Sequence, residues 1–282
     1  MMNGVVFAVL WVVISALGEL GAKAWINSAP NGAGPYFGTM SNLGVISAQA
    51  FDFLVYVAVP IFVFVVLMLV FAMIRFRAPK SEVNQIKDAK DQTRANKAFI
   101  GIWIVASILI NLLVWLHPNA IGLEQVFAAQ KPANNPNALV VDVTARQWEW
   151  IFSYPQYGIN ESFNQAGQDV LYLPVNRPVK FILRSYDPFH TYDYQVDVIH
   201  SFWIPAFGVK LDVVPGETRV LYLTPTQLTS TEQDPMARVQ CAEACGPGHP
   251  YMEANVHVVT ASQFASWVKL QHKYAAEGYA AI

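Results

Sequence analysis

Two long runs of apolar residues dominate the first half of the chain. Residues 53–74 form an uncharged run of 22, and residues 98–116 form a run of 19 in which Ser107 and Asn111 are the only polar side chains. A helix needs about 20 apolar residues to cross the hydrocarbon core of a bilayer. The pattern therefore predicts a hairpin of two membrane-spanning helices within residues 52–116.

The apolar run at the N-terminus is shorter, and it has two interpretations. It covers residues 4–18 and is followed by charged residues. A run of this length fits the apolar core of a secretory signal peptide, and the AKA sequence at 22–24 resembles a cleavage site. The preceding MMNG lacks the basic residues of a signal peptide, which favours a retained span. Residues 1–24 are predicted to be either an extra transmembrane helix or a signal peptide.

The pattern changes after residue 137 to short segments that are rich in β-branched and aromatic residues and are separated by Pro, Gly and Asn. Many short strands at this spacing are typical of a β-sandwich or a Greek-key barrel. The predicted strands are 139–145, 147–154, 170–173, 179–185, 195–201, 209–214, 218–224, 237–241 and 254–260. Residues 117–137 are predicted to be a linker, and residues 138–282 a domain.

A short helix is predicted to close this domain. Ser262 is a candidate N-cap, because its hydroxyl can accept a hydrogen bond from a free backbone N–H in the first turn. The side chains expected to pack back on the domain are Phe264, Trp267, Val268 and Tyr274.

Charge predicts the membrane topology and excludes one class of partner. Only 13% of the residues are charged and 54% are hydrophobic, which is unusual for a soluble domain. The formal net charge of -2 argues against nucleic acid, because phosphate binding needs a basic face. The loop at 75–97 holds seven basic and three acidic side chains, and such loops stay in the cytoplasm. Residues 25–51 and the C-terminal domain are therefore predicted to be extracytoplasmic.

The candidate chemistry lies in two stretches, VIHSFWIP at 198–205 and QCAEACGPGHPYM at 240–252. Two thiols, two imidazoles and a thioether form a donor set for a soft metal, so copper or zinc fits better than magnesium or calcium. The candidate donors are His200, Cys241, Cys245, His249 and Met252.

The spacing of these residues allows them to converge on one point. A Cys-x3-Cys turn can aim the sulfurs of Cys241 and Cys245 at the same place. Gly246 and Gly248 are expected to let the chain curl back, because glycine tolerates backbone conformations that other residues avoid. His200 is expected to arrive from a separate strand.

Three other interpretations of the same residues remain open. A disulfide between Cys241 and Cys245 is plausible outside the cytoplasm, but it leaves the histidines without a role. Structural zinc could use both cysteines with His200 and His249, but it gives no role to Met252. The histidines could also be ordinary buried residues of a β-sandwich.

The chain resembles subunit II of haem-copper terminal oxidases, the cytochrome c oxidase family. The resemblance rests on C-x-E-x-C-x3-H-x2-M at 241–252, on VIHSFWIPAFGVK at 198–210, and on the preceding helix hairpin. It implies a membrane-anchored all-β protein, in which N-terminal transmembrane helices are followed by a cupredoxin-like Greek-key β-sandwich. The family's sandwich holds a dinuclear copper centre called CuA.

The resemblance also implies a role for each candidate donor. Cys241 and Cys245 are expected to bridge the two coppers. His200 and His249 are expected to bind one copper each. Met252 is expected to be a weak axial ligand.

Two further residues take their roles from the same resemblance. The main-chain carbonyl of Glu243 is implied to be the other axial copper ligand, and its carboxylate to reach a magnesium site at the border with subunit I. The segment QWEW resembles the family's Q-W-x-W motif, whose first tryptophan, here Trp148, receives electrons from the donor. Alternate residues of a strand share one face, so the predicted strand 147–154 places Trp148, Trp150, Phe152 and Tyr154 together. We expect the last three to pack in the core.

The family's function implies several partners. The chain is expected to be the electron-accepting subunit of a respiratory oxidase in a bacterial-type inner membrane, spanning the bilayer more than once. Its expected partners are oxidase subunits I and III and a small redox protein such as cytochrome c, with haem in subunit I and none in this chain. The acids Asp187, Asp193 and Asp197 predict an acidic docking patch for a basic cytochrome c.

Two alternative functions remain open from the sequence. The same CuA module could serve another haem-copper enzyme, such as a nitric oxide reductase. A protein that only binds or delivers copper belongs to a different class, and the haem content of the isolated complex distinguishes it from the others.

Overall fold

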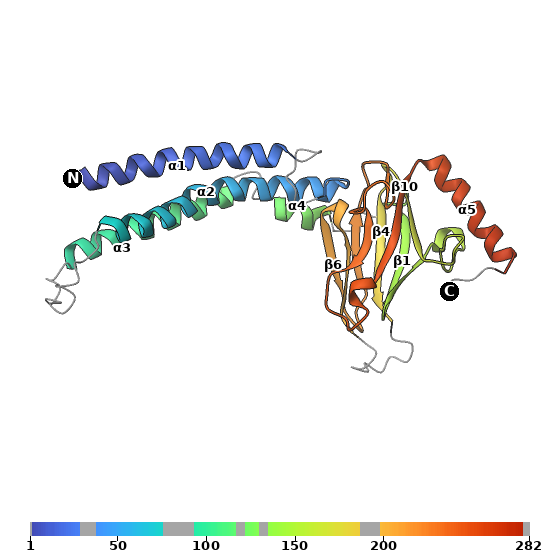
Figure 1. Ribbon diagram of the computed structural model, residues 1–282. Coiled ribbons are helices and arrows are strands. Elements are labelled where there is room, and N and C mark those ends of the chain that lie inside the picture. Colours follow the sequence, from blue (N-terminus) through green and yellow to red (C-terminus); the bar gives the residue numbers. More distant parts are fainter. Residues whose placement is uncertain are drawn as a thin grey trace. The chain divides into compact units, whose positions relative to one another are not determined.

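The structure is a computed structural model that describes residues 2–28, 38–75, 93–116, 122–129, 135–186 and 198–278 (Figure 1). Its residues form two compact units. One unit contains the long N-terminal helices. The other contains the β-rich region together with the start of the second helix, up to Ala48.

Three helices, α1 (Met2–Asn27), α2 (Asn42–Arg75) and α3 (Thr93–Leu116), are long and apolar enough to cross a membrane. The two long apolar runs lie within α2 and α3, as expected. Helix formation over residues 2–27 agrees with both interpretations of the N-terminal run. Within this unit α1 contacts α2, where the Trp11 indole donates to the carbonyl oxygen of Pro60 at 2.9 Å.

The β-rich unit is a sandwich of two sheets (Figure 1). One sheet has the strand order β2-β1-β4-β7, and the other has β3-β10-β9-β5-β6 with β8 paired to β10. The strands are β1 (Leu139–Arg146), β2 (Glu149–Ser153), β3 (Val170–Pro174), β4 (Val179–Ser185), β5 (His200–Ile204), β6 (Val209–Val213), β7 (Arg219–Leu223), β8 (Thr229–Ser230), β9 (Arg238–Cys241) and β10 (Glu253–Val259).

Two parallel pairs fix the topology of the sandwich. β1 pairs in parallel with β4, and β10 pairs in parallel with β3, whereas the other pairs are antiparallel. Parallel neighbours need a crossover connection, so the chain passes to the second sheet and back between β1 and β4. This is the predicted cupredoxin-like β-sandwich, with its core between the two sheets.

The strand predictions differ from the structure at a few places. The strand predicted over 195–201 begins at His200 and runs to Ile204. Four of its five residues are buried, so this strand lacks the alternation that would have marked its ends. β8 has only two residues and was not predicted. A short helix, α4 (Gly122–Ala129), lies within the predicted linker.

The closing helix α5 (Ala261–Ala276) forms as expected, but its predicted cap is wrong. The N-cap is Thr260, whose hydroxyl accepts from the Gln263 backbone N–H, while the Gln263 side chain accepts from the Thr260 backbone N–H. This reciprocal pair is a capping box. The buried residues of the helix are Phe264, Trp267, Val268 and Gln271.

The first turn of α2 belongs to the sandwich. Leu43 is fully buried and contributes to the hydrophobic core of the β unit. Just before it, the Met40 backbone N–H donates to the Ala206 carbonyl oxygen at 2.9 Å, and the Ser41 hydroxyl donates to the Phe207 carbonyl oxygen at 2.7 Å. The sandwich is therefore completed by chain that precedes it by about a hundred residues.

Asp169 should make the stability of the sandwich depend on pH. Burial, and to a smaller extent the charges of Glu161 and Glu149, raise the pKa of Asp169 to about 7, although Arg146 opposes the shift. The folded state therefore holds this proton more tightly than the unfolded chain. The resulting stabilisation is complete below the usual aspartate pKa and is lost as the pH rises through 7.

We therefore expect Asp169→Asn to flatten the fall in unfolding free energy between pH 4 and 8. Chemical denaturation of the full chain at a series of pH values measures this dependence. A variant whose pH dependence matches that of the wild type would show that Asp169 is not its source.

Candidate metal centre

The sheet that contains β5 and β9 brings the two motif stretches together. His200 is the first residue of β5, and Cys241 is the last residue of β9. These strands are antiparallel neighbours, with Phe202 opposite Cys241. The backbone N–H of Cys241 donates to the carbonyl oxygen of Met252 at 3.1 Å, which closes the loop between them.

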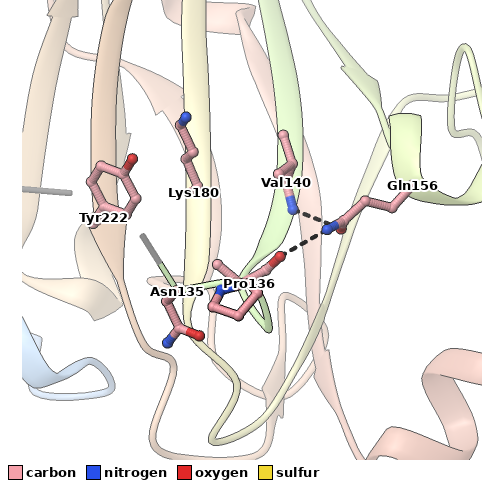
Figure 2. Close-up of a pocket in the computed structure, with 7 residues that line it drawn as sticks. Asn135, Pro136, Val140, Gln156, Lys180 and Tyr222 are labelled. Atoms are coloured by element: carbon pink, nitrogen blue, oxygen red, sulfur yellow. Dashed lines mark hydrogen bonds between the residues drawn. The ribbon is translucent and has the colours of Figure 1, made fainter. Parts of the chain in front are cut away.

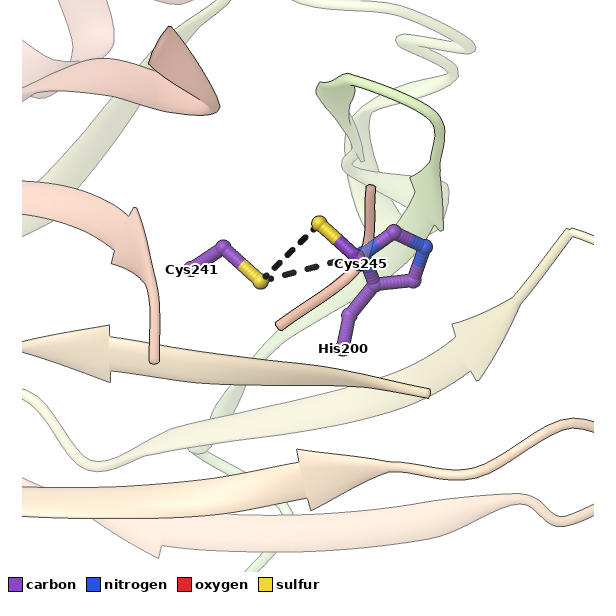
Figure 3. Close-up of side chains that lie close together, drawn as sticks. All are labelled: His200, Cys241 and Cys245. Carbon is purple, nitrogen blue, oxygen red and sulfur yellow. Dashed lines mark hydrogen bonds between the residues drawn. The ribbon is translucent and has the colours of Figure 1, made fainter. Parts of the chain in front are cut away.

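The sulfur atoms of Cys241 and Cys245 lie close to each other, with His200 beside them (Figure 3). They are 3.7 Å apart, and both cysteines are free thiols. The Cys241 sulfur is 3.8 Å from His200 Nδ1, and the Cys245 sulfur is 3.5 Å from His249 Nδ1. The Met252 sulfur lies 3.8 Å from that of Cys245. All five predicted donors therefore converge.

Glu243 combines a main-chain carbonyl beside the centre with an exposed side chain. Its carbonyl oxygen lies 3.2 Å from the sulfur of Cys241, within the donor cluster. Its side chain is exposed. The main chain of this residue is therefore available to the centre, while the carboxylate is free to meet another group.

Burial sets the protonation of the centre. His200 and Cys245 are each 1% exposed. Burial, with His249 as the smaller cause, lowers the pKa of His200 to about 4, so its imidazole is neutral and can ligate. Burial, followed by the charge of Cys241 and its hydrogen bond, raises the pKa of Cys245 to about 12. A buried pair of thiolates needs a cation to compensate it, and a soft metal supplies that charge.

The two loop glycines have different roles, and one differs from the prediction. Gly246 has φ +111°, a conformation that favours glycine, as the curl of the loop requires. Gly248 has φ −84°, which any residue can adopt. A Cβ atom there would lie 2.3 Å from Trp148 Cδ2, so the ring of Trp148 requires glycine at this position.

Three of the four aromatic residues predicted to share one strand face lie in the core, and Trp148 is the exception. Trp150, Phe152 and Tyr154 are fully buried in the core. Trp150 supports the centre, because its indole donates to the Met252 carbonyl oxygen at 3.2 Å and its ring lies edge-on to His200. Trp148 precedes the strand and is 40% exposed.

A hollow lies on the outer face of the four-stranded sheet (Figure 2). Gln156 closes one side of it, accepting from the Val140 backbone N–H and donating to the Ala138 carbonyl oxygen, both at 2.9 Å. Lys180 is the only charged residue among those that line it. The hollow therefore contains no soft donor set like that of the cysteine loop.

The predicted acidic patch at 187–197 lies outside the described residues.

The fold and the site together define a class. Helices that are long and apolar enough to cross a membrane precede a cupredoxin-like domain, in which a buried cluster of His200, Cys241 and Cys245 is compatible with copper. Residues 139–259 match the family described as cytochrome c oxidase subunit II, periplasmic domain. The domain at 139–259 belongs to the subunit II family of haem-copper oxidases, as the motifs predicted.

Individual relatives have similar descriptions. Cytochrome c oxidase subunit 2 of Bacillus subtilis is 31% identical over 207 residues, which cover 72% of this chain and 53% of the relative. The probable subunit 2 of Rickettsia bellii is 28% identical over 243 residues, 80% of each chain. The solved periplasmic domain of subunit II from Bradyrhizobium japonicum is 28% identical and has a TM-score of 0.39, with coverage of 48% of this chain and 94% of that one. The chain spans about half the length of several curated relatives.

Proposed function

We propose that this chain accepts electrons for a respiratory haem-copper oxidase at a dinuclear copper centre. The observation that carries the proposal is the convergence of two free thiols with two imidazoles, a thioether and a main-chain carbonyl oxygen. Zinc needs four donors, and this set offers six. The two cysteine sulfurs lie between the imidazoles of His200 and His249. This arrangement would suit two coppers, each bound by one imidazole and both sulfurs.

The residues of the chain would hold this centre with little rearrangement. His200 and Cys241 are fixed by paired strands, and Met252 is fixed by the backbone of Cys241. When bound, the copper pair supplies a one-electron redox centre. A rigid set of ligands favours fast electron transfer, because few atoms move when the charge changes. The buried core around Trp150 also excludes water from the side of the centre that faces the sandwich interior.

We further propose the arrangement of the chain in a bacterial-type inner membrane. The basic loop at 75–97 is assigned to the cytoplasm by its charge. The residues that follow α3 are then extracytoplasmic, with residues 138–282 as the copper domain. The proposed partners are the bilayer, oxidase subunits I and III, and cytochrome c or a similar donor. Electrons would leave for haem in subunit I, where oxygen is reduced.

Glu243 is proposed to link the centre to subunit I. Its exposed carboxylate can coordinate a hard cation such as magnesium, while its carbonyl lies beside Cys241. The two roles use different atoms of one residue, so both can be filled together.

Isolation of the complex through a tag on this chain tests the proposed function. The expected preparation contains a haem-bearing subunit I and consumes oxygen when it is given reduced cytochrome c. A preparation that reduces nitric oxide instead would assign the chain to another haem-copper enzyme. Copper-loaded chain that never copurifies with haem would support a copper-delivery role.

Trp148 should control the transfer of electrons into the centre without building it. We expect Trp148→Ala to slow reduction by cytochrome c at least about tenfold, because an exposed ring beside the ligand loop is lost. The electron paramagnetic resonance (EPR) spectrum of the copper should not change. Stopped-flow reduction of the purified complex measures the rate. Loss of the copper signal in this variant would mean that Trp148 is a structural residue instead.

A further inference from the structure

The carbonyl oxygen of Cys245 accepts hydrogen bonds from two neighbouring side chains. Gln147 Nε2 donates to it at 2.7 Å, and Trp148 Nε1 donates at 3.0 Å. A carbonyl oxygen has two lone pairs and can accept both. Two consecutive residues before β2 are therefore tied to the loop that carries the second cysteine, 98 and 97 positions further along the chain.

The face of the Trp148 ring is held by the same loop. A Cβ atom at Gly248 would lie 2.3 to 2.6 Å from three ring atoms of Trp148, which shows how closely the ring approaches the backbone. A Cβ atom at Gly246 would lie 3.1 Å from Gln147 Nε2 and 3.2 Å from Trp148 Cζ2. The ring is nevertheless 40% exposed, so part of it remains accessible to a docking protein.

We propose that Gln147 and Gly248 are positioning residues that fix the Trp148 indole for electron transfer, an inference that rests on the proposed function. One electron passes from a reduced metalloprotein donor, which is oxidised, through the indole to the metal centre. No covalent bond forms or breaks. The indole N–H contacts the backbone of Cys245, so the Trp148 ring is joined to the residue that carries a proposed ligand sulfur.

The two residues act on the indole in different ways. Gln147 supplies the second hydrogen bond to the Cys245 carbonyl oxygen and so restrains the direction of that carbonyl. The same carbonyl oxygen accepts from the Trp148 indole. Losing one such hydrogen bond reduces the population of the restrained geometry by between about twofold and tenfold. Gly248 leaves room for the ring, so a methyl group there must displace it. The rate should therefore fall more in Gly248→Ala than in Gln147→Leu.

The test uses the full chain in detergent with 5-fluorotryptophan in place of tryptophan. The Trp148 fluorine signal is assigned by its absence in Trp148→Phe. Gly248→Ala and Gln147→Leu are expected to shift this signal and leave the other seven in place. Ala244→Ser, at an exposed position of the same loop, is the matched control and should shift nothing.

The same variants are then compared in the copper-loaded complex. Reduction by cytochrome c is expected to slow about tenfold in Gly248→Ala and between about twofold and tenfold in Gln147→Leu. Reduction by hexaammineruthenium(II), which needs no protein docking, and the copper EPR spectrum should not change.

Three outcomes would overturn the inference in distinguishable ways. Unchanged fluorine signals and rates in both variants, with slow transfer in Trp148→Ala, would reject the positioning roles and keep that of Trp148. Fast transfer in Trp148→Ala would reject the role of Trp148 and the inference with it, but not the copper centre. Loss of the copper signal in both variants would show that they build the metal site.

Discussion

Cys245→Ser is expected to abolish the copper pair and not merely to shift its reduction potential. The Cys245 sulfur contacts three of the other donors, from Cys241, His249 and Met252. A serine hydroxyl is a hard, weakly acidic group that cannot bridge two coppers as a thiolate does. Metal analysis should therefore fall from two coppers per chain to one or none, and electron transfer from cytochrome c should be lost.

Met252→Leu provides the matched control within the same site. Leucine conserves most of the volume of a fully buried methionine, so the loss of stability should stay below about 1.5 kcal/mol. It removes a proposed axial ligand and neither bridging sulfur, so the copper pair should persist with a shifted potential. A copper pair that survives in Cys245→Ser would contradict the bridging role.

Leu43→Ala should destabilise the sandwich strongly, although Leu43 belongs to a helix that begins about a hundred residues before the first strand. Its side chain is fully buried in the core of the β unit. Truncation of a buried leucine removes apolar contacts and leaves a cavity, which costs about 2–5 kcal/mol. Hydrogen exchange of β-sheet amides in the full chain should show this loss as faster opening.

Leu228→Ala is the control for this measurement. Leu228 is 57% exposed, and a surface substitution of this kind usually changes the unfolding free energy by less than about 0.5 kcal/mol. Equal exchange rates in the Leu43 and Leu228 variants would show that the first turn of α2 does not support the sandwich.

The sequence predicted the elements whose pattern is strong. Long uncharged runs and alternating strands have few alternatives, so α3 and most strands were found within a few residues. The start of α2 was predicted wrongly, because the helix begins at Asn42, inside the predicted loop at 25–51. The metal donors were predicted because His200 and the cysteine loop carry chemically distinctive side chains at a recognisable spacing. In the structure each of the other donor atoms lies within 3.8 Å of one of the two cysteine sulfurs.

The remaining features depend on contacts between distant segments. The first turn of α2 carries no local signal that Leu43 enters the sandwich. The conformation of Gly248 is ordinary, and its need for glycine comes from Trp148 on another segment. Gln147 belongs to the recognised aromatic motif, but its bond to the Cys245 carbonyl appears only once the strands are placed.

Above all, we propose that this chain holds two coppers bridged by Cys241 and Cys245. Metal analysis combined with EPR of the oxidised, copper-loaded full chain tests it most directly. We predict two coppers per chain and a spectrum in which one unpaired electron is shared over two copper nuclei. One zinc per chain, or the spectrum of a single isolated copper, would contradict the assignment.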